Sequence, residues 1–127
     1  MMKKLSVEQE NSIVERLEEL VLLGGPESVH ELIETFFHTG RKNLAEMKMA
    51  IEKSSYDLFK NAAQNLKSVC LNLGAADFAQ ICQAAAHDKS FHKKTEAGAM
   101  LLRIESQLTI TENFLRGFIQ DNQSSAG

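Results

Sequence analysis

Apolar residues recur every three or four positions along most of this chain, and that spacing predicts a series of amphipathic helices. The first predicted helix starts after Ser6, because Ser6 and Gln9 form a capping box. It stops at Gly24 and Gly25, and Pro26 is suited to open the next helix. Its apolar face is expected to contain Ile13, Val14, Leu17, Leu20 and Val21.

The second predicted helix is long and ends near Lys53. Its apolar positions are Val29, Ile33, Phe36, Gly40, Leu44, Met47 and Ile51, with a tight helix contact expected at Gly40. The third predicted helix is capped by Ser54 or Ser55 and ends at Gly74, because glycine suits the left-handed conformation of a helix end. Its core stripe is Phe59, Ala62, Leu66, Val69, Cys70 and Leu73.

A fourth predicted helix is shorter and is followed by a polar loop over residues 87–94. The apolar face of this helix contains Phe78, Ile81, Cys82 and Ala85. The last helix carries a heptad-like seam of Ala97, Leu101, Ile104, Leu108, Leu115 and Phe118. Residues 121–127 are polar and are expected to form a flexible tail after a single domain over residues 1–120. Because most connections are short, the pattern predicts an all-α fold, an antiparallel up-and-down four-helix bundle with an additional N-terminal helix.

Composition narrows the class of protein without changing this fold. The chain has 127 residues, 43% of them hydrophobic and 24% charged, which is typical of one soluble globular domain. The net charge of −3, with both signs mixed, gives no basic surface for nucleic acid. No apolar run approaches the roughly 20 residues that span a bilayer, and no apolar signal segment follows the first lysines. We therefore expect a cytoplasmic monomer that contacts neither membrane nor nucleic acid.

The two cysteines, Cys70 and Cys82, lie inside apolar helical patterns. Their spacing fits neither a redox pair nor a zinc site. They are expected to be reduced, buried thiols that pack in the core. Nothing else in the sequence calls for a cofactor.

The outward side of the third helix is the candidate functional surface. Gln64 lies almost opposite the core stripe, and Lys60, Lys67, Ser68 and Leu71 are expected to share its outward side. A cation one turn away, a small neighbour and an exposed leucine together favour a docking surface. Periodicity alone also allows a simple solvated helix face, because single exposed leucines are common.

The segment AAQNLKSVCLNLGA, residues 62–75, resembles the signature of histidine phosphotransfer (HPt) domains, which read roughly A-H-x-L-K-G-S and then L-G. The matching positions are Ala63, Leu66, Lys67, Leu73 and Gly74. Residues 24–51 resemble the family's second helix, and residues 78–86 resemble the helix after the signature. The resemblance implies the same antiparallel bundle and a place in two-component phosphorelays. Its partners would be the receiver domain of a response regulator or a hybrid sensor kinase.

Two departures from the signature lie where the family performs its chemistry. Gln64 replaces the phosphoryl-accepting histidine, and Ser68 replaces the following glycine. A neutral imidazole nitrogen has a free lone pair, whereas the amide nitrogen of glutamine has its lone pair delocalised into the carbonyl. In the family the lysine at Lys67 would stabilise phosphoryl charge. The resemblance therefore implies a non-catalytic pseudo-phosphotransfer protein that binds receiver domains without carrying phosphate.

Other interpretations remain open at this point. Another histidine could accept phosphate, although His30, His38, His87 and His92 all lack the signature's pattern one turn later. The fold could also serve an unrelated protein partner.

Three further features of the sequence are expected to be structural. His30, Glu34 and His38 share one side of the second helix, but no matching set on another helix predicts a metal site. The acidic first helix is expected to be a solvated face, although receiver or kinase partners could use it. Adjacent Phe36 and Phe37 cannot both face one core, so one ring is expected near the surface, beside the helix that carries Gln64.

Overall fold

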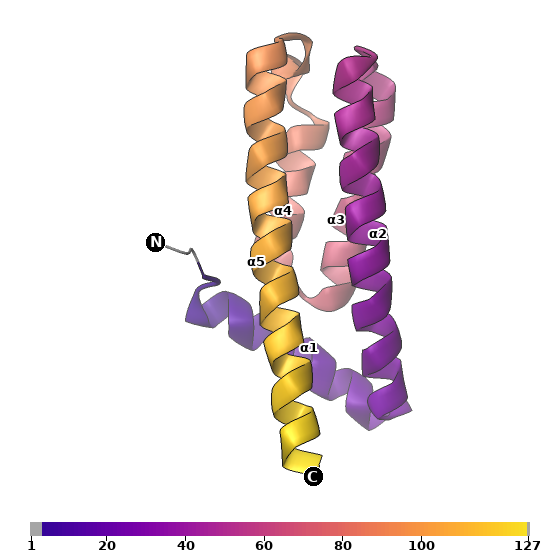
Figure 1. Ribbon diagram of the computed structural model, residues 1–127, viewed down its shortest axis with the longest axis vertical. Helices are drawn as coiled ribbons and strands as arrows, with labels where there is room; N and C mark the ends of the chain where they lie inside the picture. The colour runs from indigo at the N-terminus through magenta and orange to yellow at the C-terminus, as the bar shows by residue number, and fades with distance from the viewer. Residues whose placement is uncertain (1–3, 127) are drawn as a thin grey trace.

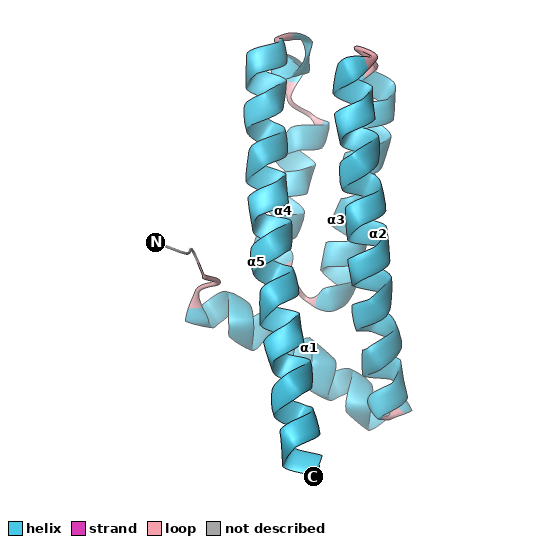
Figure 2. Cartoon of the chain, in the orientation of Figure 1, coloured by secondary structure: helices cyan, strands magenta, loops and turns pink. Residues whose placement is uncertain are grey.

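The computed structural model describes residues 4–126, without the side chains of residues 89–90 and 122–126. The chain forms five α-helices and one short 3-10 turn, and no strand occurs in the described part (Figure 2). The elements are α1 (Val7–Gly24), α2 (Pro26–Glu52), α3 (Tyr56–Leu73), α4 (Ala76–Ala86), η1 (Lys89–His92) and α5 (Lys94–Ala126). The all-α prediction is confirmed.

Helices α2, α3, α4 and α5 lie alongside one another, and consecutive helices run in opposite directions (Figure 1). Each of the four contacts the next, and α5 returns to contact α2 as well as α4. Helix α1 crosses the end of this group near the turn between α3 and α4 (Figure 1). The short connections explain the alternation, because a few residues can only return the chain antiparallel.

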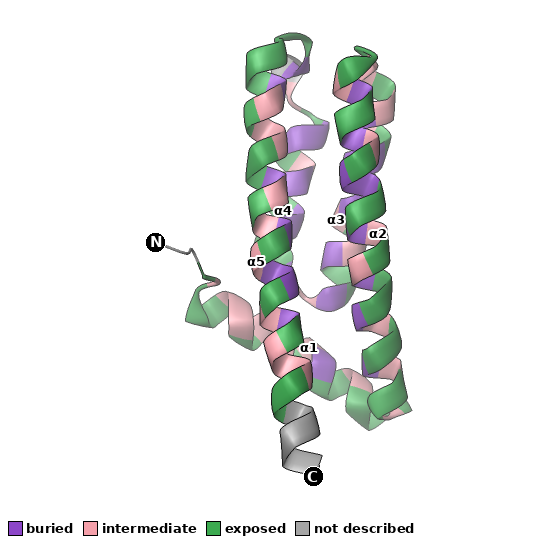
Figure 3. Cartoon of the chain, viewed as in Figure 1, coloured by how far each residue is buried: buried purple, intermediate pink, exposed green. Residues whose placement is uncertain are grey.

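The buried residues lie mainly on the sides of the helices that face one another, and the exposed residues lie mainly on the outer sides (Figure 3). The largest fully buried side chains are Ile13, Leu17, Ile33, Phe36, Met47, Phe59, Leu66, Leu73, Ile104, Leu108 and Leu115. All of these positions, including Leu115, lie in the apolar stripes expected from the sequence. Val21 departs from the prediction, because it lies in the last turn of α1, where the helix passes beyond its neighbours, and is exposed.

Local capping chemistry sets the helix bounds. The Ser6 hydroxyl accepts a hydrogen bond from the Gln9 amide, and the Gln9 side chain accepts one from the Ser6 amide, so the expected capping box is confirmed. Ser55 caps α3 by accepting from the Leu58 amide at 3.3 Å. Gly74 ends α3 in the left-handed conformation at φ 85°, as predicted.

Side chains of α1 donate hydrogen bonds to backbone carbonyl groups at the end of α3. These bonds hold α1 against the turn between α3 and α4. The Ser12 hydroxyl donates to the Gly74 carbonyl at 2.7 Å, and Arg16 Nε donates to the Asn72 carbonyl at 2.9 Å. Free carbonyl groups at a helix end need such partners. The additional N-terminal helix therefore supports the end of α3.

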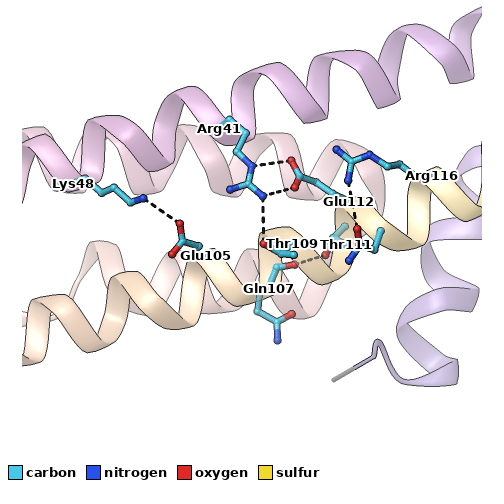
Figure 4. A network of polar contacts seen from close by, with 9 residues as sticks. Arg41, Lys48, Glu105, Gln107, Thr109, Thr111, Glu112 and Arg116 are labelled. Carbon is cyan, nitrogen blue, oxygen red and sulfur yellow. Dashed lines mark hydrogen bonds and ion pairs between the residues drawn. The ribbon is translucent and has the colours of Figure 1, made fainter. Parts of the chain in front are cut away.

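A close contact between α2 and α5 brings the partly exposed Arg41 to the buried Glu112, an ion pair that the sequence pattern did not reveal (Figure 4). At Gly40 the helices approach so closely that a Cβ atom would lie 2.8 Å from Leu108 Cδ1, which confirms the expected tight contact. Arg41 directly follows Gly40. Its Nε donates to the buried Glu112 carboxylate at 3.1 Å, and a terminal guanidinium nitrogen donates to the other carboxylate oxygen and to Thr109. These contacts fix α5 against α2.

Two of the expected boundaries differ from those observed. The segment expected as a polar loop contains η1, and Phe91 within it is buried against Phe59 with ring centroids 4.9 Å apart. Helix α5 continues to Ala126, past the boundary expected at residue 120. The polar composition of residues 121–126 does not interrupt a helix, because they contain neither glycine nor proline. Gly127 and the side chains of residues 122–126 lie outside the described residues.

The two adjacent phenylalanines of α2 face different surroundings, as expected: one lies in the core and the other lies near the surface. Phe36 is fully buried and Phe37 is half-buried. The Arg116 guanidinium lies over the Phe37 ring, 5.0 Å from its centroid. Phe37 therefore lies beside α5.

Candidate functional site

The outward side of α3 presents three of the five expected residues to solvent. Gln64 and Ser68 are exposed, and Leu71 is 53% exposed. Lys60 and Lys67 are half-buried. Long lysine stems commonly cover apolar surface while the ammonium group stays polar.

A hydrogen bond holds Lys67 of α3 to α4. Its Nζ donates to Gln83 Oε1 on α4 at 2.7 Å. This contact fixes the ammonium group in place, so less side-chain entropy is lost when a ligand binds there. Gln83 was missed in the sequence, since helical spacing identifies the face on which a residue lies but not its partner on another helix.

The Ser68 hydroxyl points back to its own helix. It donates to the Gln64 carbonyl at 3.3 Å, one turn earlier. A serine that bonds to the preceding turn keeps its oxygen close to the backbone. Ser68 therefore adds little bulk to the surface next to Gln64.

Gln64 itself is an uncharged group on a rigid support. Two nearby residues on the inner side of α3, Ala63 and Leu66, are fully buried and anchor the helix to the core. Within residues 4–126 no hydrogen-bond partner of the Gln64 side chain was found, so its amide is available to donate and to accept. The arrangement offers hydrogen bonds, one fixed cation and one apolar side chain.

Beneath this surface lie the two thiols. Cys70 and Cys82 are both fully buried and free, as predicted. The contact with Cys82, together with burial, raises the pKa of the Cys70 thiol. A thiol with a raised pKa stays protonated near neutral pH, and the protonated form is a poor nucleophile.

Native protein is expected to resist thiol reagents. We expect neither cysteine to react with Ellman's reagent until the protein unfolds, with a native rate at least about 1000-fold below that in guanidinium chloride. The absorbance of the released thiolate measures both rates. Rapid modification of either cysteine in the folded protein would contradict the packing described between α3 and α4.

The four histidines lie away from the outward side of α3. His30 and His38 are exposed on α2, and His87 is exposed at the end of α4. His92 is also exposed, and its ring lies 5.8 Å from that of Tyr56. Within the described part of the chain, no group of three or more histidine, cysteine, aspartate or glutamate residues is placed to hold a metal ion. None of the described helices is long and apolar enough to cross a membrane.

Comparison of the chain with protein-family models, with curated proteins and with solved structures gave no match. The HPt resemblance therefore rests on residues 62–75 and on the order of the helices.

Proposed function

We propose that this protein is a pseudo-phosphotransfer module that binds receiver domains through the outward side of α3 and does not carry phosphate. The observation that carries the proposal is the exposure of Gln64 at the centre of that side, at the position of the family's histidine. Lys67 stands at the position of the signature's lysine, and Ser68 and Leu71 follow it on the same helix. Response regulators and hybrid sensor kinases are the proposed partners, in the cytoplasm.

The helix arrangement supports an HPt-like interpretation of the fold. An HPt-like domain needs four antiparallel helices with the signature helix inside the group. Here α3 contacts both α2 and α4, and its outward side remains open. In this interpretation α2–α5 form the four-helix bundle, and α1 is the additional helix that supports the end of α3.

The side chains of this surface are suited to binding a receiver domain but not to accepting its phosphoryl group. An acidic receiver pocket would meet the Lys67 ammonium, which Gln83 already holds in place. Leu71 supplies apolar area. Full burial of a leucine is worth about 1.5–3 kcal/mol, and Leu71, which is 53% exposed, can contribute about half of that before the costs of association. The Gln64 amide can form hydrogen bonds across the interface, but it lacks the free nitrogen lone pair needed to attack an aspartyl phosphate.

Lys67→Glu is expected to weaken receiver binding mainly through association. Reversing one charge at the edge of an interface lowers the rate of encounter with an acidic partner, here by about tenfold at low salt. Stopped-flow or surface plasmon resonance at two salt concentrations measures this change. The matched control is Lys48→Glu, which reverses a charge on α2. Equal rates for the Lys67 variant and the unmodified protein would count against this surface.

A phosphorylation assay tests directly whether the protein accepts a phosphoryl group. After incubation with a phosphorylated receiver domain, the unmodified protein is expected to carry no acid-labile phosphate. The control is the double variant Gln64→His with Ser68→Gly, which restores both signature residues and is expected to accept phosphate. Label on the unmodified protein would show instead an active phosphocarrier that uses another histidine. Failure of both to bind any receiver would favour an unrelated partner.

A further inference from the structure

The last turn of α1 exposes a group of apolar side chains that contacts no other part of the described chain closely enough to bury it. Leu22 is 87% exposed and Leu23 is 76% exposed, and Val21 beside them is exposed as well. Single exposed leucines are ordinary, but three adjacent apolar residues at one corner are a larger patch. They lie where α1 meets α2, at the opposite end of α2 from its connection to α3 (Figure 1).

Glutamates continue from this patch along the outer side of α1. Glu15, Glu18 and Leu22 follow the i, i+3, i+7 spacing of one helix side, and both glutamates are exposed. The first turns of α2 add Glu27 and Glu31, which are also exposed. The apolar patch therefore lies at the end of an acidic stripe.

The acidic character is confined to this part of the chain. Residues 1–34 contain eight glutamates against two lysines and one arginine, whereas the remaining residues contain more basic than acidic side chains. The arginine, Arg16, is already engaged with Glu19 at 3.3 Å and with the Asn72 carbonyl. The last turn of α1 contains no basic residue that would offset the negative end of the helix dipole.

We propose that this acidic leucine corner, Val21–Leu23 with Glu15, Glu18 and Glu27, is a second docking surface that binds a basic amphipathic helix of a partner protein. The leucines would enter the apolar face of that helix, and lysine or arginine side chains flanking it would meet the glutamates. A second copy of this chain fits poorly, because its own corner carries the same negative charge. An anionic membrane surface is repelled for the same reason.

This surface is on a different helix from Gln64, and its test is independent of the proposed receiver binding. The probe is a synthetic amphipathic helical peptide of leucine and lysine, added to isotope-labelled protein and followed by NMR. We expect shifts at Val21–Leu23 and at the neighbouring glutamates, and an affinity that falls steeply with salt. A peptide with glutamate in place of lysine is expected not to bind.

Leucine variants distinguish binding at the acidic leucine corner from a general attraction between a basic peptide and an acidic protein. Leu22→Ser combined with Leu23→Ser is expected to weaken peptide binding at least about tenfold while leaving the fold intact, because both side chains are exposed. The matched control is Leu102→Ser on α5, at a leucine 68% exposed, which is expected to bind as the unmodified protein does.

Four outcomes would overturn the proposal. They are the absence of peptide binding, shifts confined to other helices, equal losses in the Leu22/Leu23 and Leu102 variants, and an equal affinity for the acidic peptide. Two further measurements test the competing occupants. A dimer that the Leu22 and Leu23 substitutions dissociate, or binding to phosphatidylcholine vesicles that they abolish, would assign the corner to a second copy or to a lipid surface instead.

Discussion

Gly74→Ala is expected to lower the free energy of unfolding by about 3 kcal/mol. Gly74 has φ 85°, and an alanine in that left-handed region costs about 1–2 kcal/mol. Its new Cβ would also lie 2.9 Å from the Ser12 carbonyl oxygen and 2.9 Å from Arg16 Cβ, so α1 would have to shift. Such overpacking costs about 1–3 kcal/mol. The glycine is needed both to end α3 and to admit α1.

Thermal and urea unfolding measure this effect, and we expect a melting temperature lower by about 10 °C. The matched control is Gly98→Ala in α5, where a Cβ would meet nothing within 4 Å and the backbone is helical. Alanine is expected to stabilise that position by about 0.5–1 kcal/mol, because glycine is a poor helix former. Equal effects at the two glycines would contradict the contact between α1 and the end of α3.

Arg41→Leu is expected to cost about 2–3 kcal/mol of stability. The substitution leaves Glu112, whose side chain is 3% exposed, as a buried carboxylate without its ion-pair partner. Breaking a fully buried pair costs about 3–5 kcal/mol, and we take a smaller value because the Arg41 side chain is 46% exposed. The hydrogen bond to Glu112 also raises the pKa of Arg41, against the effect of its desolvation. Because the folded pKa is raised, this contribution is fully present below the ordinary pKa of arginine and is lost only as the pH rises through the raised value.

Two controls test the Arg41 prediction. The double variant Arg41→Leu with Glu112→Leu is expected to recover most of the lost stability, because it removes the buried charge together with its partner. Lys48→Leu breaks the more exposed pair with Glu105, 3.1 Å long, and is expected to cost less than about 1 kcal/mol. Urea unfolding at neutral pH measures all three. A double variant as unstable as Arg41→Leu alone would mean that the pair is not the reason for the loss.

The helices and their ends were predictable because local chemistry determines them. Ser6 with Gln9, Ser55 and Gly74 each act within one turn of the residues that they cap, so the sequence contains the whole signal. The apolar spacing likewise identified the inner faces. The continuation of α5 to Ala126 is not evident from the sequence, because the polar composition of residues 121–127 is equally typical of a flexible tail.

Contacts between distant residues could not be predicted in this way. In the sequence, Glu112 is simply a polar residue of the last helix. It lies beside Arg41 only because α2 and α5 approach each other closely at Gly40. Similarly, Gln83 meets Lys67 because α4 packs against α3, and Phe91 is buried because η1 folds back onto Phe59. Periodicity indicates which side of a helix is buried, but the helix packing decides which polar side chains meet.

In the candidate site, too, helical spacing predicts which residues are exposed but not which side chains of different helices meet. Helical spacing was enough to place Gln64, Ser68 and Leu71 on the solvent side of α3. It was not enough to show that Lys67 is drawn toward α4 by Gln83, because that depends on a contact between two helices. The proposed docking surface therefore has a fixed cation at its edge and an uncharged amide at its centre.

The most direct test of receiver docking is an NMR titration of isotope-labelled protein with receiver domains from its own genome. We predict shifts clustered on residues 60–71 of α3 and at Gln83, with no phosphoryl donor present. Shifts confined to other helices, or no shifts with any receiver domain, would contradict docking at the Gln64 surface.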